Sequence, residues 1–177
     1  MSADRRASLS DVEAQVVGED LARIYARIAA TAMRDVPICN PALQVAAIGF
    51  RGFADRAVGI IVTPWFMNLI VAAPPAENGP HAWPAGASVR LNLPAGDIDF
   101  TASILDGFGG LLSCSLFSPM FDFASMDAAR AVAAEALTAL FAPSLAADLA
   151  PSAKSGARLD RRAFLGGRLG AEEARRP

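Results

Sequence analysis

A proline interrupts the most apolar stretch of this chain, between residues 59 and 71. Pro64 has no amide hydrogen and a fixed φ, so a central β-strand cannot continue through it. A strand should therefore end near Thr63, and the Thr63-Pro64 pair suits the cap and first position of a single helical turn. The turn would carry Trp65, Phe66 and Met67. On a bend these large side chains either close one end of the core or contact a partner.

From residue 42 onwards short apolar runs separated by turn residues indicate β-strands, and three of them alternate apolar and polar residues with the period of two that is typical of one buried face, at residues 89–93, 98–104 and 112–116. The expected strands are residues 45–50, 57–62, 69–72, 88–93, 97–104 and 112–116. The links between the last three are too short for helical crossovers, so these strands should be antiparallel.

A helix should precede the strands and another should follow them. Ser10 and Glu13 have the spacing of a capping box, which predicts that a helix begins between them. Ser125 can cap a second helix that runs to about Phe141. The order of elements predicts an α+β domain of two layers, in which both helices cover one face of an antiparallel meander sheet.

The charges are unevenly distributed along the chain. Residues 1–149 hold nine Arg against fifteen Asp and Glu, a net charge of −6, whereas residues 150–177 have a net charge of +4. We therefore expect a disordered start at 1–10, one domain at 11–149 and a basic Arg/Gly-rich tail at 150–177. An acidic body is a poor match for nucleic acid, and a basic tail suits an acidic partner or the acidic body itself.

The first twenty residues and the two cysteines are typical of a protein in a reducing compartment. No apolar run reaches the ~18 residues that would span a bilayer, so no membrane insertion is expected. The first twenty residues hold five acidic side chains and no apolar segment, unlike a secretory signal. Cys39 and Cys114 are too far apart for a CxxC pair or a metal cluster. A cytoplasmic location is expected.

The sequence gives little support to a catalytic function. His81 is the only histidine and lies in a Pro-rich loop, and Asp97 and Asp99 share the wet face of a strand. We therefore predict no enzymatic activity, no catalytic residues, no cofactor and no metal site. One alternative is a small thiol-dependent or ligand-binding enzyme centred on Cys114. Such an enzyme would need an exposed thiol, whereas the alternation of residues 112–116 predicts that the Cys114 side chain points inward. Another is a homodimeric chaperone that uses the sheet as its interface.

A second proline-interrupted apolar segment, residues 117–123, follows the last strand and contains three Phe and a Met. Both interrupted segments lie at strand ends, so they could meet at one edge of the sheet and bind apolar segments of a partner protein. The tail would add positive charge to that surface. The predicted partner-binding residues are Trp65, Phe66, Met67, Phe117, Met120, Phe121, Arg161 and Arg162.

Four separated motifs between residues 62 and 167 have the order and spacing found in one family, and the resemblance extends over about residues 21–170. They are Val62-Thr63-Pro64-Trp65, Leu93-Pro94-Ala95-Gly96, Leu112-Ser113-Cys114-Ser115-Leu116-Phe117-Ser118-Pro119 and Arg161-Arg162-Ala163-Phe164-Leu165-Gly166-Gly167. Together they resemble the HybE/HupJ family of [NiFe]-hydrogenase assembly chaperones. The last motif also resembles the RRxFL core of a twin-arginine export signal, although such signals lie at the N-terminus.

The resemblance implies a small cytoplasmic α+β protein without enzymatic activity or cofactor. Its implied partners are the precursors of the hydrogenase large and small subunits, the latter with its twin-arginine signal, before assembly and export. Other maturation proteins are further candidate partners. Some relatives carry a rubredoxin module with paired CxxC motifs, but this chain has two cysteines, so the resemblance implies no iron binding by such a module.

Overall fold

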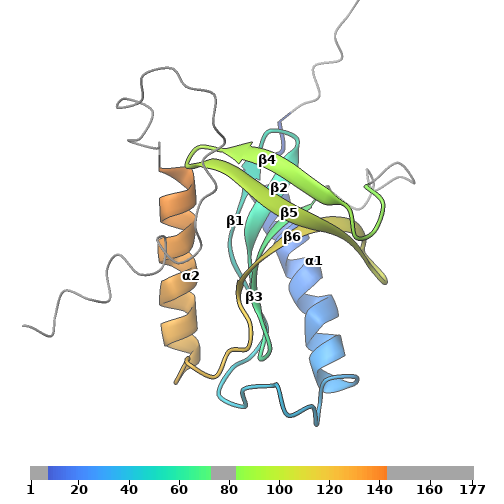
Figure 1. Ribbon diagram of the computed structural model, residues 1–177, viewed down its shortest axis with the longest axis vertical. Helices are drawn as coiled ribbons and strands as arrows, with labels where there is room; N and C mark the ends of the chain where they lie inside the picture. Colours follow the sequence, from blue (N-terminus) through green and yellow to red (C-terminus); the bar gives the residue numbers. More distant parts are fainter. Residues whose placement is uncertain (1–7, 73–82, 143–177) are drawn as a thin grey trace, which may run out of the picture.

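The computed structural model describes residues 8–72 and 83–142, which form an α+β domain with one antiparallel sheet (Figure 1). This confirms the predicted class. The elements are α1 (Asp11–Ala30), β1 (Ala46–Phe53), β2 (Arg56–Val62), β3 (Met67–Ala72), β4 (Ser88–Leu93), β5 (Gly96–Leu105), β6 (Gly109–Phe117) and α2 (Met126–Phe141). Residues 1–10 were expected to be a disordered start. Within them, Leu9 is bound to the β1–β2 turn, because its backbone amide donates to the carbonyl of Ala54 at 2.9 Å. The expected tail at 150–177 and the last residues of the expected domain, 143–149, lie outside the described residues.

The sheet consists of two three-stranded meanders joined along one seam. Its strand order is β1-β2-β3-β6-β5-β4, and every neighbouring pair is antiparallel. A single meander, in which each strand pairs with the next one in sequence, was expected and is wrong. β3 pairs with β6 instead of β4, and β4 is an edge strand. Pairing β3 with β6 places β2 and β3, the most apolar strands, away from both edges of the sheet.

The two helices lie on opposite faces of the sheet, not on one face as expected (Figure 1). Successive residues of β2 show this, because Ile60 belongs to the core beside α2 and Ile61 to the core beside α1. Side chains alternate between faces along a strand, so these two cores are on opposite sides. β2 and β3 are apolar on both faces and need cover on each, which gives three layers instead of two.

Phe50 of β1 fixes how closely α1 approaches the sheet. Its buried ring occupies the space above two glycines, Gly18 of α1 and Gly59 of β2. A Cβ atom at Gly59 would lie 2.3 Å from the ring, and one at Gly18 would lie 2.6 Å from it. The ring therefore packs against bare backbone on two sides, in a slot that no other residue type at those positions would leave open.

The predicted capping box forms at the start of α1. The Ser10 amide donates to Glu13 Oε2 at 2.9 Å, and the Glu13 amide donates to Ser10 Oγ at 3.3 Å. Hydrogen bonds from the Ser10 side chain and backbone hold the pKa of Glu13 below its usual value of 4.5.

Replacing Glu13 with Gln should remove a pH dependence of stability at this cap. Because the folded-state pKa of Glu13 is lowered, its stabilising effect is complete above pH 4.5 and is lost as the pH falls through the lower value. The melting temperatures of the wild type and Glu13→Gln should thus differ most near neutral pH and converge in acid. A difference that stays constant over the whole pH range would contradict this role.

Candidate functional site

The Thr63–Phe66 loop closes the β2–β3 hairpin, and the helical turn expected there does not form. The buried Thr63 Oγ1 accepts from the amides of Trp65 and Phe66 at 3.2 and 2.9 Å, as a helix cap would. The Thr63 amide donates back to the Phe66 carbonyl at 2.8 Å. Since Met67 already pairs with Val62 across the hairpin, the chain has no room for a turn of helix.

The second interrupted segment lies beside this loop, as predicted. Ser118 Oγ donates to the carbonyl of Trp65 at 3.4 Å, just after β6 ends at Phe117. The Phe117 ring packs edge to face on Phe123, with 5.1 Å between centroids. The two segments meet at the end of the central strands β3 and β6 and not at an edge of the sheet (Figure 1).

A third segment, the connector between α1 and β1, joins them. The backbone amide of Asn40 donates to the carbonyl of Pro64 at 2.8 Å. Its side-chain Nδ2 donates to the carbonyls of Met120 and Phe123 at 2.9 and 2.8 Å. The connector, the hairpin loop and residues 118–123 therefore form one end of the molecule (Figure 1).

Four of the predicted partner-binding side chains are accessible at this end or border it. Phe121 is 55% exposed, while Trp65, Phe66 and Phe117 are half-buried. Ile38 of the connector, 40% exposed, adds to them. We call Ile38, Trp65, Phe117 and Phe121 the end surface.

Two of the predicted residues do not belong to any surface. Met67 and Met120 are fully buried in the core beside α2, so both are corrected to core positions. Met67 lies on the same side of β3 as Leu69, which belongs to that core. Arg161 and Arg162 lie outside the described residues.

Phe66 points away from the end surface towards α1. Its ring packs edge to face on Tyr25 of α1, with 5.4 Å between centroids, and it contacts the core on that side. Burial raises the pKa of Tyr25. Phe66 therefore anchors the hairpin loop to α1, and the neighbouring Trp65 is held edge to face on it at 5.6 Å.

A pocket of about 290 Å³ opens beside Trp65, between the end of α1 and the connector. Most of the residues that line it are apolar, and one basic residue, one acidic residue and Asn40 also line it. They include Met33, Val36, Leu43, Trp65, Arg34 and Asp35. The volume lies at the lower limit of small-molecule sites, which suits a side chain of a partner better than a cofactor.

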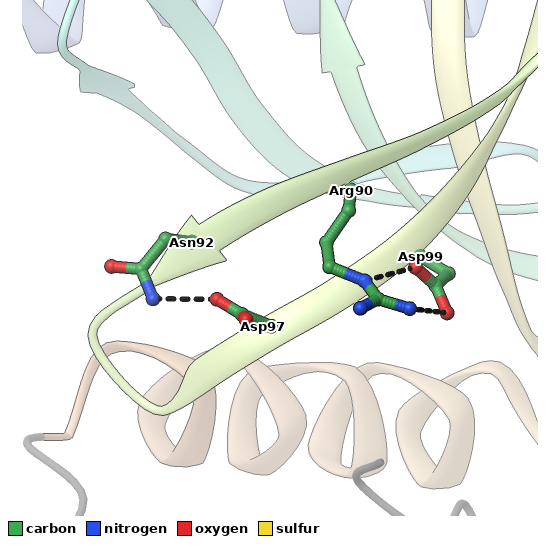
Figure 2. Close-up of polar contacts among 4 residues, drawn as sticks. All are labelled: Arg90, Asn92, Asp97 and Asp99. Carbon is green, nitrogen blue, oxygen red and sulfur yellow. Dashed lines mark hydrogen bonds and ion pairs between the residues drawn. The ribbon is translucent and has the colours of Figure 1, made fainter. Parts of the chain in front are cut away.

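The β4–β5 hairpin carries a polar ladder on one face (Figure 2). Arg90 Nε and Nη2 donate to the two carboxylate oxygens of Asp99 at 2.7 and 3.2 Å, and Asn92 Nδ2 donates to Asp97 Oδ1 at 2.7 Å. The hydrogen bond and charge of Asp99 raise the pKa of Arg90. Each carboxylate is thus engaged by a cross-strand neighbour, as in a solvated sheet face.

The structure favours a structural role for Cys114. Its side chain is buried in the core beside α2, and it forms no disulfide with Cys39. His81 lies outside the described residues. Within residues 8–72 and 83–142, no cluster of three His, Cys, Asp or Glu side chains could hold a metal ion. None of the helices described there is long and apolar enough to cross a membrane.

A family model described as "[NiFe]-hydrogenase assembly, chaperone, HybE" matches residues 17–167 of this chain. The chain belongs to the HybE family. It is 46% identical over 160 residues to the hydrogenase expression/formation protein HupJ of Bradyrhizobium diazoefficiens, covering 90% of this chain and 92% of that protein. Protein HoxT of Cupriavidus necator is 41% identical over 158 residues, with 84% and 87% covered.

The fold agrees with that of a HybE protein. The solution structure of HybE from Escherichia coli superimposes with a TM-score of 0.57 at 22% identity, covering 90% of this chain and 95% of that one. This similarity supports the α+β architecture described above.

Three of the four motifs that suggested the HybE family lie within the described residues, and they reach two ends of the domain. The first and third motifs meet at the end surface, where the Ser118-Pro119 peptide bond is cis. Within the third motif, Cys114 is buried and Ser115 is exposed. The second motif forms the β4–β5 turn, where Gly96 has a φ of 126° and the Ala95 amide donates to the Leu140 carbonyl at the end of α2. These motif residues of Leu93–Gly96 thus position α2, not the end surface.

The predicted site residues included neither Asn40 nor Ile38, because the two prolines of residues 37–41 indicate only a connector. An Asn-Pro pair marks a turn. A polar residue between apolar neighbours can also indicate a buried hydrogen-bonding role, but its partners, more than 70 residues later, leave no local pattern.

Proposed function

We propose that this HybE-family protein binds precursors of [NiFe]-hydrogenase subunits through its end surface and holds them until assembly. The observation that carries the proposal is Phe121, a large apolar side chain that is 55% exposed in the segment whose Ser118 bonds the Trp65 loop. Together with Ile38, Trp65 and Phe117 it makes a group of large apolar side chains at one end of the molecule, and grouped apolar side chains mark interaction sites where a single exposed one does not.

Unassembled subunits supply a matching chemistry. Obligate interfaces between subunits are more apolar than ordinary protein surface, so a precursor exposes apolar segments before its partner arrives. An aromatic side chain fixed by backbone hydrogen bonds can bind such segments with little loss of conformational entropy. Trp65 is held in this way by Thr63, and the pocket beside it can accept one apolar side chain.

Both subunit precursors are proposed clients, the small one with its twin-arginine signal, in the cytoplasm before export. Other maturation proteins are further candidates. Arg161 and Arg162 would contribute by meeting acidic groups on a client, which would make capture sensitive to salt. No catalytic step is proposed, since the relatives are named for hydrogenase expression and formation and Cys114 is buried.

Changing Phe121 to Ala should weaken binding of a subunit precursor by about 2 kcal/mol, roughly 30-fold, with little change in melting temperature. The exposed ring contributes little to the fold but would be an anchor in the complex. Binding of each purified precursor to the wild type and the variant can be measured by fluorescence anisotropy.

Ile104 offers a matched control. It is 69% exposed near the other end of the sheet, by the β5–β6 turn, so Ile104→Ala also removes exposed apolar surface but should leave binding unchanged. Equal affinities for all three proteins, or equal losses in both variants, would refute the proposed surface.

A further inference from the structure

Asn40 uses nearly all of its hydrogen-bonding capacity at the end surface. The residue is only 6% exposed. Both Nδ2 hydrogens are donated, to the carbonyls of Met120 and Phe123, and Oδ1 accepts from the Ala42 amide at 2.9 Å. Its backbone amide donates to Pro64, and its carbonyl accepts from the Leu43 amide at 3.1 Å.

This pattern requires a side-chain amide. Two carbonyl oxygens need two donors on one atom, and the Ala42 amide needs an acceptor next to it. An aspartate has the same shape but no donor when ionised, and it would place a negative oxygen against two carbonyls. The neighbours also fix the orientation of the Asn40 side-chain amide. If it were flipped, Oδ1 would face the two carbonyl oxygens and Nδ2 would face the Ala42 amide hydrogen.

We propose that Asn40 is the positioning residue that sets the spacing of Trp65 and Phe121, which rests on the proposed function of the end surface. Its backbone holds Pro64, the residue before Trp65, and its side chain holds the two carbonyls on either side of Phe121. The direct links between the two segments are the pairing of Met67 with Phe117 and the 3.4 Å bond from Ser118 Oγ to the Trp65 carbonyl, and neither involves residues 119–123. The position of Phe121 relative to Trp65 is therefore fixed through the connector, because Asn40 bonds both segments.

The effect on binding is one of preorganisation. If the side-chain bonds are removed, residues 118–123 lose two buried tethers and sample more conformations in the free protein. A client must then restrict them on binding, which lowers affinity without removing any contact atom. Asn40 itself need not touch the client.

The test compares Asn40→Asp and the milder Asn40→Ala with Val17→Ala. Val17 is buried on α1 in the core on the other face, so its variant controls for lost stability alone. Two measurements are made well below every melting temperature. They are hydrogen exchange of the Phe123 and Phe66 amides, which donate to Met120 and Thr63, and binding of each subunit precursor.

We expect exchange at both amides to be at least about tenfold faster in the Asn40 variants, and precursor binding about tenfold weaker. Val17→Ala should change neither. Unchanged exchange at the Phe66 amide, or the same changes in Val17→Ala, would overturn the positioning role. If the wild type binds neither precursor, the proposed function fails, and hydrogen exchange still decides whether Asn40 couples the two segments.

Discussion

Replacing Phe50 with Ala should lower the free energy of unfolding by about 3–5 kcal/mol, which is a large part of the stability of a domain of this size. Phe50 is buried between Gly18 and Gly59, and neither glycine has a side chain that could fill the vacated slot. The cavity would stay open, since α1 and the sheet meet through backbone there. Urea denaturation monitored by circular dichroism measures the change.

Phe121→Ala is the control for side-chain size, because it removes the same atoms from an exposed position and should cost far less. The slot itself is tested by Gly59→Ala, which would place a methyl group against the Phe50 ring. Overpacking of this kind costs about 1–3 kcal/mol. Adding Phe50→Leu to Gly59→Ala should relieve part of that cost, and strictly additive effects would show that the two residues are not coupled.

Replacing Met120 with Ala should destabilise the domain by about 2–5 kcal/mol, whereas the same change at the adjacent Phe121 should leave stability almost unaltered. Met120 is fully buried beside α2, and Phe121 points outward. Two neighbouring residues of one apolar segment thus have opposite roles. Thermal melts of the two variants distinguish them.

Client binding by the Met120 variant should follow its fold. Below its lowered melting temperature the variant should still capture a precursor, since the side chain is not part of the end surface. A Met120→Ala protein with a normal melting temperature and no capture would place Met120 on the surface and contradict its assignment to the core.

The sequence predicted the individual elements better than their assembly. The alternation over residues 88–93, 97–104 and 112–116 and the capping box at Ser10 reflect local physics, and all of them are present. The faces covered by α1 and α2 were predicted incorrectly because β2 is apolar on both sides. Such a strand gives no period of two from which one buried face can be read. The place of β6 was missed because pairing across the sheet depends on the whole set of strands.

Within the site, the meeting of the two interrupted segments followed from their positions at strand ends. The buried position of Met67 was also within reach of the sequence, since Met67 shares the face of Leu69 if the alternation is extended back by one step. Met120 and Asn40 were not, because neither lies in a regular element. Their environments depend on contacts between the connector and residues 118–123, far apart in the chain.

The seam between the two meanders also bears on how the protein folds. Within each meander the strands are neighbours in sequence and can pair by closing short loops, whereas the seam joins Leu69 of β3 to Cys114 of β6 across the whole second meander. Closing that contact costs more chain entropy and is the slower step in a topology of this kind. Until it closes, one side of β3 has no strand partner and remains open to pairing with other chains.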